Sequence, residues 1–464
     1  MYSIDEIIES RNLAVIGASR DPMKPGSALI KLLKDTDYKG QVAGVNPQGG
    51  DVYGVPLYRS VDEIPFAVDL AVFIIPPKAI PPSLIQCAKK GVKGVVIVSE
   101  GFAETGAQGK QYQEDVRNIL QSTGMRGFGP NTIGILNTAT GLTTSYFADA
   151  RMLRPGSIGF VSQSGIFIGA LLQYLSSLDG FHISKGIGLG NKVDVDESDA
   201  LTYLMGDDQT RIVGMYLEDI RDGRRFLETA RKAVMEKPVL LLKGGRTPAG
   251  ARASASHTGS MAVDDVVLDG ALRQAGVLRM QNLEELIGTI MGFQWMPLPR
   301  GDKIAMVTFS GAQGIMSADA ATEEGLGIAR FTQETQEKLA RVLSTPSKAQ
   351  NPVDIFPDMM THGFEKTTTE ILRALLEDDG VHGVLFISFA APGADPFHHL
   401  VEVIKERKTK PVFFSLLGNK DDIENSRTYL DKQRIPSYLF PEMALRVFSN
   451  MLQYARTVGE AKEG

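Results

Sequence analysis

The feature that most constrains the fold of this chain is a strand–helix alternation that runs along it. In the first part, short apolar runs bounded by Gly, Pro or Ser alternate with helical patterns. The expected strands cover residues 12–16, 41–45, 69–75, 95–99 and 126–129. The expected helices end near Lys34 or cover residues 79–90 and 108–122. Alternation of this kind predicts a doubly wound parallel α/β sheet.

Two further α/β units follow, and the third repeats the second. The strand at 158–162, followed by Gln-Ser-Gly, parallels the strand at 304–310, followed by Gly-Ala-Gln-Gly. Asn191-Lys192-Val193-Asp194 likewise parallels Asn351-Pro352-Val353-Asp354. The prolines of the linker at 296–301 mark a boundary between the two units. We therefore expect three domains, at residues 1–129, 130–296 and 297–464.

Composition narrows the class of protein. The 464 residues are 43% hydrophobic and 22% charged, with a net charge of −6, which is typical of a soluble globular protein and does not favour nucleic-acid binding. The single cysteine, Cys87, excludes an intrachain disulfide and a cysteine zinc site, and we expect a small core residue in a helix at 83–90. We expect no metal site in this chain. No apolar run is long enough for a membrane span and the acidic start at 1–9 is no signal peptide, so a cytoplasmic location is expected.

The strand ends of the first unit form the expected ligand site, because ligands of doubly wound sheets bind at the carboxyl ends of strands. The first turn lacks a complete G-x-G-x-x-G, and Asn46-Pro47 stands where an acidic ribose-binding residue would be expected. Arg20 and Lys24 beside a helix start favour a phosphorylated ligand. Simple turn formation is the alternative explanation of these Gly and Pro residues. The candidate binding residues are Gly17, Ala18, Ser19, Arg20, Lys24, Asn46, Pro47, Ile75, Pro76, Ser99 and Glu100.

The later units each place a turn of small residues between their first strand and its helix. Helix N-termini expose free N–H donors and attract an exposed anion by about 0.3–1 kcal/mol each. Two such ends facing one another would hold a doubly charged phosphoryl group without lysines, whereas two ordinary tight turns are the alternative. The candidate phosphate-binding residues are Ser162, Ser164, Gly165, Ile166, Gly311, Ala312, Gln313 and Gly314.

Residues 236–260 are the most unusual stretch of the chain. After an apolar strand we expect a long loop of Gly, Ala, Ser and basic residues that contains a single histidine, His257. Ordering such a loop costs roughly 1–2 kcal/mol per residue, so inside compact α/β sequence it is usually functional or disordered. Lys243, Arg246 and Arg252 suit it to an anion, and neutral imidazole is available as a nucleophile near pH 7. A histidine on a surface loop is the alternative.

Glu218 follows the strand at 212–217 in the sequence Y-L-E-D-I. A carboxylate at this strand end could accept a hydrogen bond from one imidazole nitrogen, which fixes the tautomer and makes the other nitrogen more nucleophilic. Asp219 is a competing candidate for the same role. A solvated residue at the end of a strand is the alternative explanation of Glu218.

Four motifs in order resemble the acyl-CoA synthetase (nucleoside-diphosphate-forming) superfamily. They are G-P-N-T-I-G at 129–134, V-S-Q-S-G at 161–165, Y-L-E-D-I at 216–220 and S-A-S-H-T-G-S at 254–260. The first two units resemble the α subunit of succinyl-CoA synthetase. The α subunits of ADP-forming acetate–CoA ligases are similar over essentially the whole chain, the third unit included.

The resemblance implies a fold, a mechanism and a partner. The fold would be a Rossmann-like CoA-binding domain followed by two flavodoxin-like, succinyl-CoA synthetase-like domains. Acyl-CoA and phosphate would give an acyl phosphate, which phosphorylates His257 on a mobile loop with Glu218 as orienter. Coenzyme A would bind the first domain, with Asn131 of the second motif added to its site.

The nucleotide site of the family belongs to an ATP-grasp domain, for which the three units leave no residues, and this chain has no P-loop. The resemblance therefore implies an ATP-grasp β subunit that binds Mg²⁺ with ADP or ATP, in an α₂β₂ heterotetramer. The expected reaction makes acid, ATP and CoA from acyl-CoA, ADP and phosphate, with acetyl-CoA as the expected thioester. A regulatory subunit that senses CoA or acyl-CoA without chemistry is the alternative, and a nicotinamide-dependent dehydrogenase is disfavoured by the first turn and Asn46.

Overall fold

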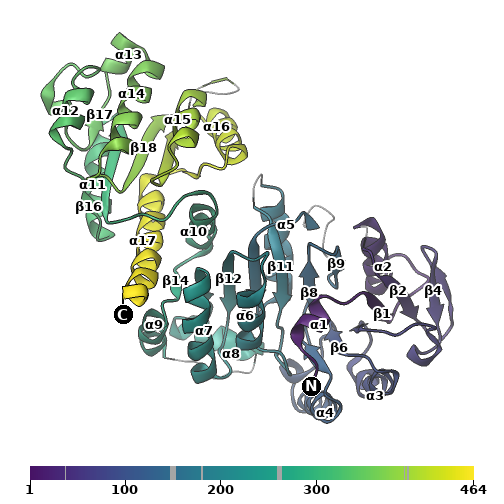
Figure 1. Cartoon of the computed structure of the whole chain (residues 1–464). Helices are drawn as coiled ribbons and strands as arrows, with labels where there is room; N and C mark the ends of the chain where they lie inside the picture. Colours follow the sequence, from purple (N-terminus) through teal and green to yellow (C-terminus); the bar gives the residue numbers. More distant parts are fainter. Residues whose placement is uncertain are drawn as a thin grey trace. The chain divides into compact units, whose positions relative to one another are not determined.

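The computed structural model (Figure 1) describes residues 1–464 apart from 37, 147–152, 179–180, 259–263, 391, 394–396 and 464. It also leaves out the side chains of residues 166–168, 255–258, 346–347 and 461–463. The described chain forms two compact units, at residues 1–280 and 281–464, and each is described by itself.

The first unit opens with helix α1 (Ile4–Ile8) and a sheet in the strand order β3-β4-β2-β1-β5-β6-β7. Its strands are β1 (Asn12–Ile16), β2 (Gln41–Val45), β3 (Gly50–Val52), β4 (Val55–Tyr58), β5 (Leu70–Phe73), β6 (Gly94–Ile97) and β7 (Arg126–Phe128). The strands of this sheet pair in parallel apart from the β3–β4 hairpin, so the predicted parallel sheet is confirmed for this part of the described chain. The hairpin was not predicted from the sequence. Its turn has positive φ angles at Tyr53 and Gly54, a geometry usually signalled by Asn-Gly or Asp-Gly.

The helices of this first part are α2 (Pro25–Asp35), α3 (Ile80–Lys90) and α4 (Ala107–Thr123), with short 3-10 helices η1 (Val61–Glu63), η2 (Pro77–Ala79) and η3 (Ala103–Thr105). Pro25 begins α2, which suits a residue without an N–H at a position that needs none. Gly91 ends α3 and Gly124 ends α4 in the left-handed conformation, as helix C-termini commonly do.

The second sheet has the strand order β14-β13-β12-β10-β11-β8-β9. Its strands are β8 (Ile135–Asn137), β9 (Leu142–Thr143), β10 (Ile158–Ser162), β11 (Ile183–Gly188), β12 (Ile212–Leu217), β13 (Val239–Lys243) and β14 (Leu278–Met280). Strands β10 to β14 pair in parallel, β8 pairs with β11 antiparallel, and β9 pairs antiparallel with β8 at the edge. The helices are α5 (Gly165–Ser176), α6 (Glu197–Gly206), α7 (Gly223–Glu236), α8 (Pro248–Thr258) and α9 (Asp265–Gln274). Because β10 lies between β11 and β12, the strand order reverses at the end of β10.

Helix α8 corrects the loop expected around His257. Residues 248–258 are helical in the structure, so the prediction of an irregular loop was wrong for this part of the segment. Thr247 Oγ1 accepts a hydrogen bond from the backbone N–H of Gly250 at 3.1 Å, and Pro248 occupies the first helical position. A Thr cap, a following Pro and a run rich in Ala are helix-forming signals. The prediction took small side chains as a sign of a loop, although Ala has the highest helix propensity.

The second compact unit begins with α10 (Leu283–Trp295) and contains a sheet in the order β16-β15-β18-β19-β20, with β17 also paired to β15. Its strands are β15 (Lys303–Thr308), β16 (Gly327–Ile328), β17 (Val353–Asp354), β18 (Gly383–Phe389), β19 (Val412–Leu417) and β20 (Ser437–Tyr438). Its other helices are α11 (Gly311–Glu323), α12 (Gln333–Leu339), α13 (Asp358–His362), α14 (Phe364–Glu377), α15 (His398–Glu406), α16 (Lys420–Lys432) and α17 (Pro441–Glu463), with η5 (Pro346–Ala349). Asn450 on α17 donates to Glu285 on α10 at 3.0 Å, which ties the two helices together within this unit.

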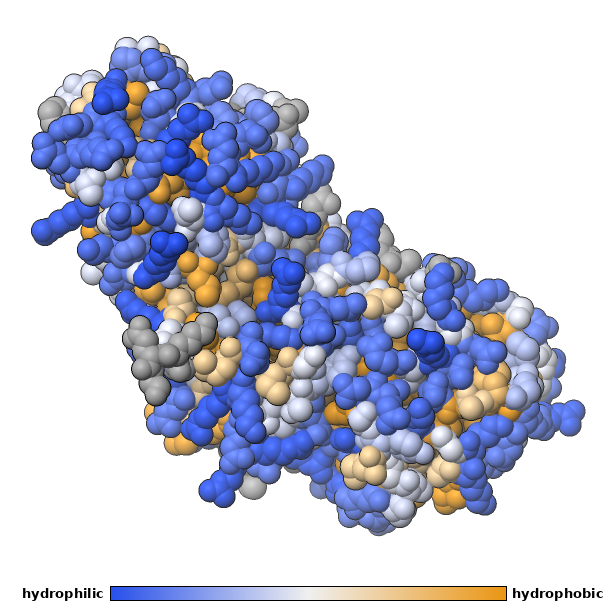
Figure 2. Space-filling model, viewed as in Figure 1, coloured by the Kyte–Doolittle hydropathy of each residue, from blue (hydrophilic) through white to orange (hydrophobic). Residues whose placement is uncertain are grey.

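The apolar residues of the chain gather in its core, and the hydrophilic residues lie mainly on its surface (Figure 2). The strand interiors are buried, and Cys87 is fully buried in α3, which confirms the expected core residue. Hydrophilic residues predominate on the face shown in Figure 2. Among the described residues, no helix is both long enough and apolar enough to cross a membrane.

Candidate active site

A cavity of about 460 Å³ opens at the carboxyl ends of β1, β2 and β5. Because β1 lies between β2 and β5, this is the point where the strand order reverses, and doubly wound sheets bind ligands at such points. The volume is within the range of small-molecule sites. The structure brings together in its lining the expected residues Gly17, Ala18, Ser19, Lys24, Asn46, Pro47, Ile75 and Pro76.

Gly17 and Asn46 shape the wall of this cavity. Gly17 has a φ of +101°, and a Cβ atom there would lie 2.2 Å from the carbonyl oxygen of Ile74, so no larger residue fits the turn. Asn46 donates from Nδ2 to the carbonyl oxygen of Ala18 at 2.7 Å and accepts from the N–H of Gln48 at 2.9 Å. The side chain of Asn46 therefore joins the turns after β1 and β2.

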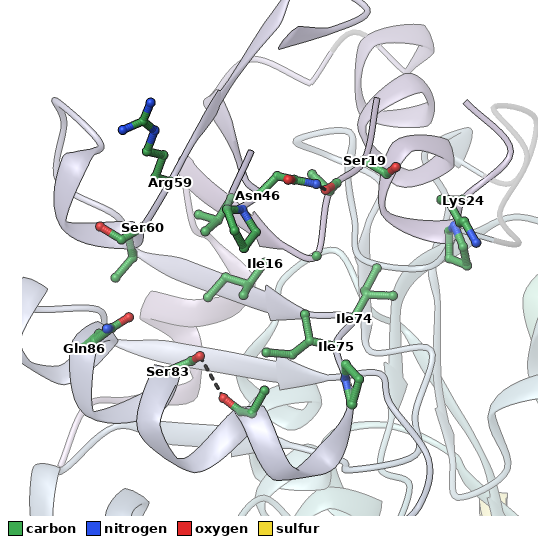
Figure 3. A pocket seen from close by; sticks show the side chains of 18 residues that line it. Ile16, Ser19, Lys24, Asn46, Arg59, Ser60, Ile74, Ile75, Ser83 and Gln86 are labelled. Atoms are coloured by element: carbon green, nitrogen blue, oxygen red, sulfur yellow. Dashed lines mark hydrogen bonds between the residues drawn. The ribbon is translucent and has the colours of Figure 1, made fainter. Parts of the chain in front are cut away.

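Two cationic side chains lie on opposite sides of the cavity (Figure 3). Lys24 caps the start of α2, and Arg59 follows β4. Neither the ammonium of Lys24 nor the guanidinium of Arg59 has an ion-pair or hydrogen-bond partner within the described part of the chain. Both charges are therefore available to anionic groups of a ligand. The sequence analysis missed Arg59 because the hairpin that carries it was not predicted.

Arg20 lies elsewhere. Its guanidinium donates from Nε to the carbonyl oxygen of Gly49 at 3.0 Å and from Nη2 to that of Gln48 at 3.1 Å. Arg20 does not line the cavity, and its side chain holds the turn between β2 and β3. In the structure the guanidinium of Arg20 therefore bonds backbone carbonyl oxygens of this turn.

The remaining expected residues of the first site also lie outside the cavity lining. Ser99 donates from Oγ to the carbonyl oxygen of Ile75 at 2.6 Å, which joins the ends of β5 and β6. The backbone N–H of Asn131 donates to the carbonyl oxygen of Ser99 at 3.0 Å, and Asn131 has a φ of 59°. Glu100 is exposed beside them.

The turn after β10 carries the first set of expected phosphate-binding residues. Ser162 Oγ donates to the carbonyl oxygen of Ser164 at 2.8 Å, and Ser164 precedes α5 without a side-chain cap bond. Gly165 begins the helix, so its first N–H groups point out of the start of α5. Ile166 follows in the helix, and its side chain lies outside the described part of the structure.

Glu218 lies beside this turn, because β12 is the neighbour of β10. Gln163 Oε1 accepts from the backbone N–H groups of Glu218 and Asp219 at 2.8 and 3.1 Å. Lys243 Nζ, at the end of β13, donates to the carbonyl oxygen of Glu218 at 2.6 Å. Burial lowers the pKa of Lys243 below its usual range. The ends of β10, β12 and β13 therefore meet at Glu218.

Tyr216 is the neighbour of the Glu218 carboxylate on the same strand. Its hydroxyl lies 3.5 Å from Glu218 Oε1. Burial, and secondly the charge of Glu218, raises the pKa of Tyr216 to about 12, so the phenol remains protonated at neutral pH. The hydroxyl of Tyr216 therefore carries a proton that it can donate to the carboxylate of Glu218.

The second set of expected phosphate-binding residues lies in the other compact unit. Gly311 begins α11, followed by Ala312, Gln313 and Gly314 in its first turn. Thr308 Oγ1 accepts from the N–H of Ser310 at 3.0 Å and orders the turn before the helix. Oε1 of Gln313 is buried and has no hydrogen-bond partner among the described residues.

His257 is in the last turn of α8, and its side chain lies outside the described part of the structure. The backbone of α8 approaches η3, which lies between β6 and α4. Gly245, with a φ of +72°, lies directly before this segment and close to Ser254. Helix α8, which carries His257, follows β13, and the last residue of β13, Lys243, donates to the carbonyl oxygen of Glu218.

Three protein families match successive parts of the chain. The CoA binding domain matches residues 11–138, the succinyl-CoA ligase-like flavodoxin domain residues 155–293, and the ligase-CoA domain residues 304–461. These families define the class of protein as a CoA ligase, and the expected fold class is confirmed.

Relatives narrow the class further. The α subunit of ADP-forming acetate–CoA ligase II of Pyrococcus furiosus is 36% identical over 469 residues, covering 99% of this chain and 100% of that protein. ADP-forming acetate–CoA ligase II of Archaeoglobus fulgidus is 36% identical and covers 97% of this chain, which spans 67% of that protein. The 4-hydroxybutyrate–CoA ligase of Nitrosopumilus maritimus is 32% identical and covers 97% of this chain, which spans 64% of it.

A solved structure agrees with these relatives. Acetyl-coenzyme A synthetase 1 of Ca. Korarchaeum cryptofilum, in complex with phosphate and ADP, has a TM-score of 0.91 and 29% identity and covers 100% of this chain and 99% of its own. The chain belongs to the family of the α subunits of ADP-forming acetate–CoA ligases, as the four motifs predicted.

Proposed function

We propose that this chain takes part in making ATP from acyl-CoA, ADP and phosphate, and that His257 carries the phosphoryl group from an acyl phosphate to ADP. Phosphate attacks the thioester carbonyl carbon, the C–S bond breaks and CoA leaves as the thiol. An imidazole nitrogen of His257 then attacks the phosphorus of the acyl phosphate, and the P–O bond to the acyl group breaks with release of the carboxylate. ADP finally takes the phosphoryl group from the histidine.

The observation that carries the proposal is the meeting of three strand ends at Glu218. The start of α5, the carboxylate of Glu218 and the strand that leads to His257 share one edge of the second sheet. A carboxylate that accepts the N–H of one ring nitrogen leaves the lone pair of the other for attack, and it stabilises the positive ring that results. The starts of α5 and α11 are the proposed phosphate ligands.

The cavity at β1, β2 and β5 is the proposed CoA site, with Lys24 and Arg59 for its phosphates. It lies in the part of the chain that matches the CoA binding domain. The free cations, the close-fitting Gly17 turn and the absence of an acid after β2 fit a phosphorylated ligand. We propose acetate as the acid, although two relatives are named for other acyl groups, 4-hydroxybutyrate and feruloyl.

The proposed partner is an ATP-grasp β subunit in an α₂β₂ assembly, which would hold Mg²⁺ with ADP or ATP. Relatives of matching length bear the name of α subunits. The test is to incubate the chain with acetyl-CoA and labelled phosphate, and separately with labelled ATP and Mg²⁺, with and without that partner. With acetyl-CoA and labelled phosphate, we expect acid-labile, base-stable label on His257. With labelled ATP and Mg²⁺, we expect this label only when the partner is present. Labelling by ATP without the partner would contradict the division of labour, and no label in any mixture would contradict the phosphohistidine.

A further inference from the structure

Gln163 connects the start of α5 to the strand end that carries Glu218. Its backbone N–H donates to the carbonyl oxygen of Tyr216 at 3.0 Å. Its Oε1 accepts from the N–H groups of both Glu218 and Asp219, and its Nε2 donates to the carboxylate of Asp219. Only 5% of Gln163 is exposed. One buried side chain therefore bonds two consecutive amides and one carboxylate of the turn after β12.

Two buried lysines hold the other side of this turn. Lys192, 3% exposed, lies 2.7 Å from Asp219 Oδ1, 3.1 Å from the carbonyl oxygen of Asp219 and 3.0 Å from Glu197 Oε2. Lys243 bonds the carbonyl oxygen of Glu218. The backbone of Glu218 is thus held at its N–H by Gln163 and at its carbonyl by Lys243. Removing Gln163 would leave the backbone N–H groups of two half-buried residues without their acceptor, and an unpaired donor away from water costs more than the hydrogen bond itself is worth.

The sequence repeat at residues 297–464, which parallels the one at residues 130–296, provides an internal comparison. There Phe309 stands between Thr308 and Ser310, where Gln163 stands between Ser162 and Ser164, so the amide side chain that makes these bonds is replaced by an apolar ring. Strand β18, the counterpart of β12, ends at Phe389 and is followed by Ala390, with no carboxylate like Glu218. The glutamine occurs in the unit that has the carboxylate and the histidine segment, and not in its repeat. Its presence therefore follows the candidate chemistry and not the fold alone.

We propose that Gln163 is a positioning residue that fixes Glu218 relative to the start of α5. The proposal rests on the proposed function, in which Glu218 orients the imidazole of His257. A displacement of about 1 Å at a reacting group can cost about 10²-fold in rate. Loss of the Gln163 side chain is expected to slow phosphorylation of His257 by about that factor. Affinity for CoA stays unchanged, because Gln163 does not line the cavity of the first sheet.

The labelling test compares the wild type with Gln163→Ala, Glu218→Gln and the double variant. The rate measured is that of acid-labile label from phosphate and acetyl-CoA. If Gln163 acts through Glu218, the double variant is no slower than Glu218→Gln alone, because residues that act as a unit are not additive. Additive losses, or a Gln163→Ala protein that labels at the wild-type rate, would overturn the proposal. Gln111→Ala, on the exposed face of α4, is the control and should label normally.

Hydrogen exchange gives a readout that does not depend on activity. Gln163→Ala should speed exchange of the amides of Glu218 and Asp219, while the strand amides of β12 keep their protection. The pair Gln163→Glu with Asp219→Asn exchanges the amide and the carboxylate and should restore both protection and labelling in part. If the wild type takes up no label, the proposed function fails, and exchange still decides the role of Gln163. Unchanged protection of these two amides in Gln163→Ala would refute it.

Discussion

Nζ of Lys192 lies 2.7 Å from Oδ1 of Asp219, and this ion pair separates the roles of two adjacent carboxylates. The carboxylate of Asp219 is bonded by Lys192 and by Gln163, which makes it part of the frame of the turn. The carboxylate of Glu218 is not bonded by either of these side chains, and Tyr216 lies beside it. We therefore assign the orienting role to Glu218 in preference to Asp219.

The first prediction compares these two carboxylates. Glu218→Gln should slow phosphorylation of His257 by about 10²–10⁴-fold, the usual range for losing an acid–base partner, with little change in stability. Asp219→Asn should lower the free energy of unfolding by about 1–3 kcal/mol, because Lys192 is buried and loses one of its charged partners. Label uptake and urea denaturation measure the two effects. A stable Asp219→Asn protein that does not label would show that the wrong carboxylate was chosen.

The second prediction concerns His257. His257→Ala and His257→Asn should abolish acid-labile, base-stable phosphate incorporation, because no other side chain is proposed to carry the phosphoryl group. Binding of CoA should stay nearly unchanged, since the cavity lies in the first sheet. Calorimetric titration with CoA provides the control. Label that persists in either variant would move the phosphorylation site elsewhere in the chain.

The third prediction uses two arginines of the first sheet as a matched pair. We expect Arg59, beside the end of β2, to bind the 3′-phosphate on the ribose of CoA, as an arginine near this point binds the ribose phosphate in other doubly wound sheets. Arg59→Gln should weaken CoA binding by roughly 10- to 100-fold, the value of a charge-assisted hydrogen bond, but leave dephospho-CoA unaffected.

Arg20→Gln is the control for this pair. Arg20 holds the turn through the carbonyl groups of Gln48 and Gly49, so its loss should weaken CoA and dephospho-CoA alike. The dissociation constants of both ligands for both variants are the measurement. An Arg59→Gln protein that loses both ligands equally would refute the assignment of the 3′-phosphate.

The fourth prediction concerns pH and Cys87. Burial raises the pKa of the Cys87 thiol to about 12, far above the value of about 8.5 for a free thiol. Between these values the folded chain binds the proton more tightly than the unfolded chain. This contribution to stability is therefore complete below about pH 8.5 and decreases as the pH rises. Iodoacetamide at pH 9 should alkylate the chain in urea but not the folded protein, and rapid alkylation without urea would contradict the burial of Cys87.

Sequence reasoning predicted the strands best. The bounds expected at 12–16, 41–45 and 212–217 agree with β1, β2 and β12. These strands lie inside parallel sheets, so they are apolar runs that end at Gly, Asn or Glu, and local composition is enough to find them. The helix at 248–258 was not found, because Gly, Ala and Ser were interpreted as loop residues and the Thr-Pro start was overlooked.

The candidate site was predictable only in part. Strand ends at a switch point identify residues such as Gly17, Lys24 and Asn46, which the cavity brings together. Where a long side chain goes depends on its neighbours, and the hairpin β3–β4 engages Arg20 and presents Arg59. The contacts of Gln163 were not readable for the same reason, because they join residues that are 55 positions apart. The domain boundaries and the roles of His257 and Glu218 stay predictions.

Because α8 is helical, the distance along its axis from Pro248 to His257 is fixed by the number of residues between them. At about 1.5 Å per residue, the nine steps from Pro248 to His257 correspond to a rod of about 14 Å. Gly244 and Gly245 lie a few residues before Pro248, and His257 lies in the last turn of the helix. Deleting one residue of α8 would turn His257 by about 100° around the axis as well as shorten the reach. Under the proposed function, the number of residues in α8 is therefore a geometric constraint on phosphoryl transfer, which an irregular chain of the same composition would not impose.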